Sequence, residues 1–115
     1  MTKKARKFNP YMRFNGLFIP NCIAQSYKIS DSAKILLGRL FQFSGQDGKC
    51  YPGRKRLCSE LSWSLRKLDH KIKELKDLGL IKTEQKDDHS PSTYTFYNVK
   101  EFYDPEEEDN EFEEP

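Results

Sequence analysis

Basic side chains that can bind an anion are concentrated in two short segments in the middle of the chain. The two segments hold Arg54, Lys55, Arg56, Arg66, Lys67, His70, Lys71 and Lys73. An arginine can form two hydrogen bonds with the edge of a guanine, a histidine can donate or accept one, and a lysine ammonium neutralises phosphate as a point charge. These residue types therefore indicate a nucleic acid as the expected ligand.

Two helical patterns position these side chains. A helix over 54–61 and a helix over 65–78 each place apolar residues at helical spacing, and Ser62 to Ser64 form the turn between them. The first helix would bury Leu57, Cys58 and Leu61, and the second would bury Leu65, Leu68, Ile72 and Leu75. At about 100° per residue, Arg66, His70 and Lys73 lie opposite Leu68. We therefore expect the second helix to present a mostly cationic face.

We expect different tasks for the polar residues of this segment. Arg66 and His70 are the base-reading candidates, because both lie opposite the apolar stripe and one turn apart. The phosphate-binding candidates are Arg54, Lys55, Arg56, Ser64, Lys67, Lys71 and Lys73. The Ser64 hydroxyl is also the expected N-cap of the second helix. A solvated helix face is the alternative explanation of these charges.

The segments on either side supply the expected core. Ser30 caps a helix over 31–43, whose apolar members are Ala33, Leu36, Leu37, Leu40, Phe41 and Phe43. Pro20 suits the first turn of a short helix, and residues 11–19 predict an extended or turn-containing segment whose Phe14, Phe18 and Ile19 enter the core. Downstream, we expect a minimal strand over 49–51 and a C-cap at Gly79 of the preceding helix. We also expect a hairpin of two strands over 80–85 and 92–97.

The order of these elements resembles the winged helix-turn-helix family. The run from Cys50 to Ser64, continued by Leu75 to Ile81, is similar to replication proteins of phages and plasmids, and so are 18–21 and 29–37. The resemblance implies a mainly α fold with a small β-hairpin (α+β), and double-stranded DNA bound with helix 65–78 in the major groove. It also implies a wing whose contact residues would be Lys82, Lys86, His89, Ser90 and Ser92, beside the acidic Asp87 and Asp88.

Charge is segregated along the chain. Residues 1–100 hold all 20 lysines and arginines and nine of the 18 acids, a formal charge of +11, whereas residues 101–115 hold the other nine acids and no base. We expect a basic flexible arm over 1–13, a winged helix-turn-helix domain over 14–100, and an acidic disordered tail or linker over 101–115. A tail that folds back on the basic face would compete with DNA and suppress weak binding.

Composition excludes several other functions. Cys22, Cys50 and Cys58 form no paired motif with His70 or His89, so we expect packed thiols and no metal. No phosphate loop or nucleophile–base pair predicts an enzyme, a cofactor or a small-molecule substrate. No apolar segment predicts a membrane partner, and a bacterial, phage or plasmid protein of the cytoplasm is expected.

The expected role is replication initiation or its regulation. A transcriptional repressor and a protein-interaction module of a replication or partition assembly remain alternatives. A second copy of the chain, in a homodimer, or a replication protein would be a further partner.

Overall fold

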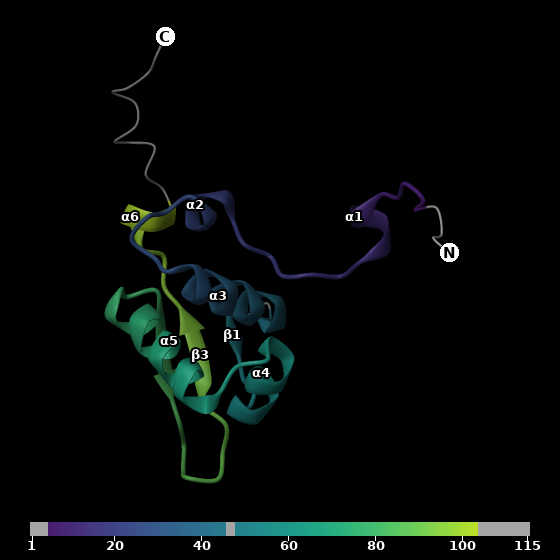
Figure 1. Ribbon diagram of the computed structural model, residues 1–115. Coiled ribbons are helices and arrows are strands. Elements are labelled where there is room, and N and C mark those ends of the chain that lie inside the picture. The colour runs from purple at the N-terminus through teal and green to yellow at the C-terminus, as the bar shows by residue number, and fades with distance from the viewer. Residues whose placement is uncertain (1–4, 46–47, 104–115) are drawn as a thin grey trace.

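The computed structural model describes residues 5–45 and 48–103 of the 115-residue chain. Helices and strands follow one another as α1 (Pro10–Arg13), α2 (Asn21–Ala24), α3 (Asp31–Phe43), β1 (Lys49–Cys50), α4 (Arg54–Leu61), α5 (Leu65–Asp77), β2 (Ile81–Glu84), β3 (Thr93–Phe96) and α6 (Lys100–Tyr103). The longest two helices, α3 and α5, lie against each other, and α4 crosses beside them (Figure 1). The predicted order of elements from 31 to 97 is confirmed.

The strands form one antiparallel sheet in the order β1-β3-β2. Ile81 lies opposite Phe96 on the β2–β3 side, and Lys49 lies opposite Thr95 on the β1–β3 side. The predicted hairpin is therefore present, and the minimal strand at 49–50 adds a third strand to its β3 edge. The helices with this small sheet confirm the expected fold, a winged helix-turn-helix.

The core lies between α3, α5 and the inner face of the sheet. Leu36, Leu37 and Leu40 of α3 have no exposed surface, and Leu68 and Leu75 of α5 have none either. The other elements add Ile23, Cys50, Leu57, Ile81, Tyr94 and Phe102 to the same cluster. Burial of such side chains is the main favourable term in folding. The positions of α4 and α5 are thus set by a shared core.

Both ends of α5 are closed by local hydrogen bonds. The Ser64 hydroxyl accepts the Lys67 N–H at 3.1 Å, as an N-cap does. At the other end Gly79 has a φ of +80°, and the N–H groups of Gly79 and Leu80 donate to the carbonyls of Lys76 and Leu75, each at 3.0 Å. This arrangement satisfies the last carbonyls and turns the chain directly into β2. The predicted C-cap glycine is confirmed.

The segment before α2 differs from the prediction. Residues 10–13 form one turn of helix, and the side chains of Phe14 and Phe18 are 60% and 64% exposed, so their predicted burial is wrong. Only Ile19 packs against the core: a Cβ added at Gly38 of α3 would lie 2.6 Å from its Cγ1 atom. Aromatic content indicated burial here, but the linker from α1 to α2 (residues 14–20) meets α3 at Phe18 and Ile19, and α1 stands away from the domain (Figure 1).

Packing continues past residue 100, the predicted domain boundary. Helix α6 places Phe102 in the core with 4% of its surface exposed, and Glu101 forms an ion pair with Lys28. The short helix α2 packs against α6, so two segments almost 80 residues apart cover the same side of the domain. The predicted acidic tail otherwise falls on 104–115, which lie outside the described residues, as do residues 1–4 of the predicted arm.

Candidate nucleic-acid interface

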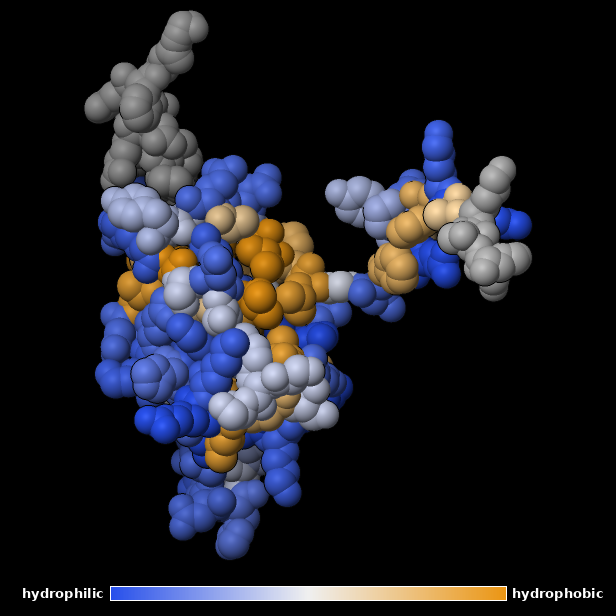
Figure 2. Space-filling view, viewed as in Figure 1, coloured by the Kyte–Doolittle hydropathy of each residue, from blue (hydrophilic) through white to orange (hydrophobic). Residues whose placement is uncertain are grey.

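The outward side of α5 carries the two predicted base-reading residues. Arg66, His70 and Lys73 are all exposed, and Leu68 and Leu75 on the opposite side are fully buried. Within the described part of the chain, Arg66 and His70 form no hydrogen bond or ion pair. Their polar groups therefore stay available to a ligand. The surface over this helix and the wing is largely hydrophilic in Figure 2.

Two other lysines of α5 have weak intramolecular contacts. Lys73 forms an ion pair with Asp77 at 3.0 Å, and both side chains are more than half exposed. The Lys67 ammonium lies 4.8 Å from the centre of the Trp63 ring, a cation–π contact. Exposed pairs of this kind contribute less than about 1 kcal/mol, so both lysines can turn toward a phosphate at low cost.

The basic run at the start of α4 has mixed surroundings. Arg54 forms an ion pair with Asp69 of α5, which joins the beginnings of the two helices. Arg56 donates to Glu60 at 3.0 Å and stacks over the Phe43 ring at 4.6 Å. Lys55 is exposed and has no partner among the described residues. Gly53 precedes the helix without a side-chain cap, so its first N–H groups stay open.

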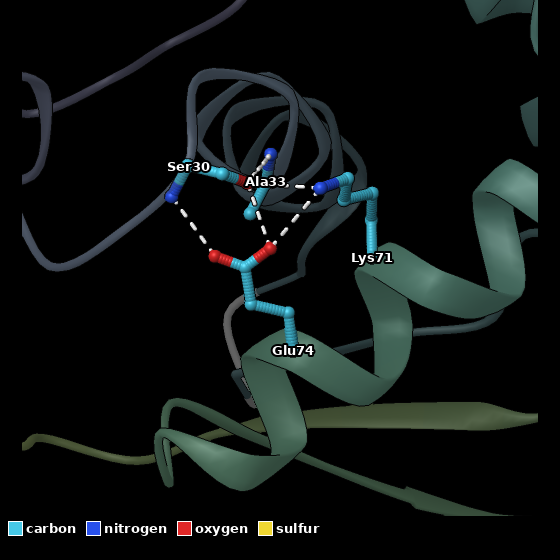
Figure 3. Close-up of polar contacts among 4 residues, drawn as sticks. All are labelled: Ser30, Ala33, Lys71 and Glu74. Atoms are coloured by element: carbon cyan, nitrogen blue, oxygen red, sulfur yellow. Dashed lines mark hydrogen bonds and ion pairs between the residues drawn. The ribbon is translucent and has the colours of Figure 1, made fainter.

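Lys71 lies in a polar cluster between α3 and α5, shown in Figure 3. The Glu74 carboxylate accepts the Ser30 N–H at 2.9 Å and the Ser30 hydroxyl at 2.7 Å. The Lys71 ammonium donates to the Ser30 Oγ at 3.2 Å and to the Glu74 Oε1 at 3.3 Å. Ser30 is also the N-cap of α3, accepting the Ala33 N–H at 3.3 Å. The structure therefore separates Lys71 from the outward residues and uses it to hold α5 against α3.

The charge of Glu74 is stabilised by this cluster. Burial alone would raise the pKa of Glu74, but the hydrogen bonds from the Ser30 N–H and hydroxyl and the ammonium of Lys71 together lower it. Glu74 is therefore ionised in the folded domain. A carboxylate supplied by α5 completes the cap of α3, 44 residues away in the sequence.

The wing loop is held by its own side chains. Asp87 accepts the His89 N–H at 2.8 Å and the Ser90 hydroxyl at 3.0 Å, and the Gln85 amide donates to the Ser90 carbonyl at 2.7 Å. The hydrogen bond from the His89 backbone is the main cause of the lowered pKa of Asp87. The acidic Asp87 thus shapes the wing loop, which projects beyond the domain where α5 begins (Figure 1).

The predicted wing residues do not gather at one point. Lys82, Lys86 and His89 are exposed, and Ser90 and Ser92 are half-buried. The Ser90 hydroxyl donates to Asp87, whereas the side chains of Lys82 and Lys86 form no hydrogen bond or ion pair with another described residue. Among these side chains, the two lysines are the ones left available for a phosphate.

Leu65 is an exposed residue of α5 that the sequence pattern assigned to the core. Its predicted burial is wrong: the side chain is 49% exposed, although it shares the apolar stripe with the buried Leu68. Leu65 is the first residue of α5, and the buried residues of this helix begin one turn later, at Leu68. Its position directly after the N-cap Ser64 was the sequence feature that indicated exposure. An apolar side chain therefore accompanies Arg66 at the start of this helix.

The cysteines are packing residues. Cys50 is 1% exposed, and burial raises the pKa of its thiol to about 12, so the thiol stays protonated at neutral pH. Cys22 and Cys58 are free thiols that pack against the core while half-buried. The predicted packed thiols are confirmed.

Residues 27–81 match a protein family described as "Helix-turn-helix domain". This segment has the fold of a helix-turn-helix domain. It spans α3 to the start of β2 and therefore contains α3, α4 and α5. No curated protein matches the chain significantly. None of the helices in the described residues is long and apolar enough to span a membrane.

Two solved structures share the fold. One is described as "N-Terminal domain of DNA binding protein", with a TM-score of 0.57 and 21% identity. The other is described as "Structure of Rep-DNA complex", with a TM-score of 0.55 and 18% identity. Each alignment covers 96% of this chain and 100% of the other. The helix-turn-helix domain and its flanking segments thus have the same architecture as these chains.

Proposed function

We propose that this helix-turn-helix domain binds double-stranded DNA with α5 in the major groove. The observation that carries the proposal is the outward side of α5, where Arg66 and His70 are exposed and unpaired among the described residues. The second helix of such a motif presents its first residues to base edges. Arg66 then forms two hydrogen bonds with a guanine, and His70, one turn later, contacts the next base.

Leu65 extends the proposed base-reading set. A half-exposed leucine at the first position of α5 is suited to the methyl group of a thymine, since apolar side chains recognise that group in the major groove. Leu65 and Arg66 together would favour a thymine next to a guanine. The sequence pattern alone did not suggest this contact.

Phosphate contacts position the domain on the duplex. Lys55, Lys67 and Lys73 are the proposed principal contacts, and Arg54 and Arg56 add charge at the open N-terminus of α4. Ser64 would contact a phosphate through its backbone, because its hydroxyl already caps α5. Lys82 and Lys86 are the proposed contacts of the wing. Lys71 is left out, because Ser30 and Glu74 hold it.

The biological role that fits best is replication initiation or its regulation. The support is the likeness to a chain described as part of a Rep–DNA complex, whose fold this chain shares over 96% of its length. A transcriptional repressor uses the same scaffold and would act at a palindromic site. A protein-interaction domain would show no salt-dependent DNA binding.

The decisive experiment selects bound duplexes from a random pool and footprints the enriched sequence. Direct repeats in the enriched DNA would favour replication, a single palindrome would favour a repressor, and a lack of enrichment would exclude sequence-selective binding. On the enriched duplex, Arg66→Ala should weaken binding by about 1–3 kcal/mol and relax selectivity at one position. The matched variant Lys73→Ala should weaken enriched and random duplexes equally. Equal losses from Arg66→Ala on both duplexes would remove Arg66 from the base-reading set.

A further inference from the structure

Residues 8–14, which we call the arm, expose a cluster of large apolar side chains. Phe8, Tyr11, Met12 and Phe14 are 55%, 94%, 84% and 60% exposed, and α1 buries no residue. Four such residues within seven positions are more than the scattered apolar residues of an ordinary surface. Figure 2 shows this apolar group on the arm, separated from the domain by a thin linker.

The arm has a defined local structure. The Asn9 side chain caps α1 by accepting the Tyr11 N–H at 3.0 Å, and the rings of Phe8 and Phe14 meet edge to face at 5.7 Å. The Arg13 guanidinium lies 5.6 Å from both ring centres. These contacts fix the two ends of the arm and leave Tyr11 and Met12 as its most exposed residues. A preformed apolar element binds at a lower entropic cost than a flexible chain does.

The domain has an uncovered apolar patch where the linker meets α3. We define the α3 patch as Phe18, Ile19 and Ile35. Ile19 packs on Gly38, the Phe18 carbonyl lies 3.2 Å from a Cβ added at Gly38, and Ile35 is one turn earlier on α3. Phe18 and Ile35 are 64% and 37% exposed. Figure 2 shows apolar surface at this place.

Charge on the two surfaces is complementary. Described residues 5–27 contain Arg6, Lys7 and Arg13 and no acid. Asp31 lies one turn before Ile35 on α3, is exposed, and has no ion pair or hydrogen bond with a described residue. A basic apolar arm therefore matches an apolar patch that has an acid at its edge.

We propose that two copies of this chain exchange arms, with residues 8–14 of each copy packed on the α3 patch of the other. The arm lies away from its own patch (Figure 1), so both surfaces are open to a second copy. An arm with these four side chains buries roughly 400 Å². Two arms and the surfaces they cover, which are the α3 patches with their polar surroundings, bury roughly 1,600 Å², the usual size of a stable interface.

This symmetric exchange goes beyond DNA binding by one domain. It brings two copies of α5 into one assembly, which is then suited to two half-sites. The association needs no DNA, so it is tested independently of the proposed function.

The first test is sedimentation equilibrium of the full chain without DNA. The unmodified chain should be a dimer, and a chain lacking residues 1–15 should be a monomer with an intact fold, because α1 contributes nothing to the core. The double variant Tyr11→Ala/Met12→Ala should raise the dimer Kd at least tenfold. Tyr51→Ala, which removes an aromatic side chain that is 56% exposed beside β1, should leave the Kd unchanged. A monomeric full chain, as would result from an arm folded on its own patch, would overturn the proposal.

The second test identifies the surface that the arm covers. Ile35→Asp should abolish self-association while far-UV circular dichroism shows a retained fold, and Phe18→Asp should do the same. Mixing the Ile35→Asp chain with the chain lacking 1–15 should give a heterodimer that is weaker than the unmodified dimer, because one intact arm meets one intact patch and half of the interface forms. Failure of this pair to associate, while the unmodified chain dimerises, would show that the arms do not use the α3 patch and would refute the exchange.

Discussion

The two sides of α5 use basic side chains for opposite purposes. On the side toward α3, Lys71 and Glu74 are held by Ser30 and fix the helix to the domain. On the outward side, Arg66 and His70 have no partner among the described residues. A basic residue on a helix of this kind is therefore not by itself a DNA contact. Its side-chain partners decide whether it holds the fold or is open to a ligand.

The largest expected effect separates the buried and exposed leucines of α5. Leu75→Ala should lower the free energy of unfolding by about 2–5 kcal/mol, because it leaves a cavity in a fully buried site. Leu65→Ala removes the same atoms from a half-exposed site and should cost less than about 1 kcal/mol. Urea denaturation of both variants measures the difference. Similar losses would mean that Leu65 is buried in solution.

The next effect concerns the cluster that holds α5 to α3. Glu74→Ala should lower the free energy of unfolding by about 1–3 kcal/mol, because it removes the acceptor of the Ser30 N–H and hydroxyl and leaves Lys71 without its ion pair. Glu84→Ala is the matched control, since the exposed Glu84 side chain on β2 forms no hydrogen bond or ion pair with a described residue. Equal stability of the two variants in urea denaturation would show that the cluster does not hold the helix.

The free energy of unfolding should change with pH as Glu74 is protonated. Because the folded-state pKa of Glu74 is lowered from its ordinary value of 4.5, its contribution is fully present above pH 4.5 and is lost as the pH falls through the folded pKa. The stability difference between the unmodified chain and Glu74→Gln should therefore shrink below pH 4.5. Thermal unfolding at a series of pH values measures it; a difference that grows toward acid would contradict the lowered pKa.

The smallest effect compares two lysines of α5 in DNA binding. Lys73→Ala should reduce the slope of log K against log salt concentration by about 0.9, the share of one neutralised phosphate. Lys71→Ala should leave the slope unchanged, because Ser30 and Glu74 keep its ammonium from the DNA. Fluorescence anisotropy on a fixed duplex at several salt concentrations gives both slopes. A reduced slope for Lys71→Ala would show that Lys71 contacts the DNA, and it would contradict the distinction between the outward side of α5 and the side toward α3.

Local patterns were sufficient for most of the fold. The caps at Ser30, Ser64 and Gly79, the helices α3, α4 and α5, and the strands of the hairpin all follow from residues close together in the sequence. These features depend on hydrogen bonds within one turn and on apolar spacing, which a sequence displays directly. The pairing of β1 with β3 was not predicted, because its partners lie 44 or more residues apart.

The sequence by itself determined the helix-turn-helix, its cationic helix and the packed cysteines. Only the tertiary structure decided which of those cations are open, since Lys71 is held by a serine 41 residues away. It also decided that Leu65, Phe14 and Phe18 are exposed. The physical reason is that helical periodicity gives the direction of a side chain, whereas burial and pairing depend on whether another element lies in that direction.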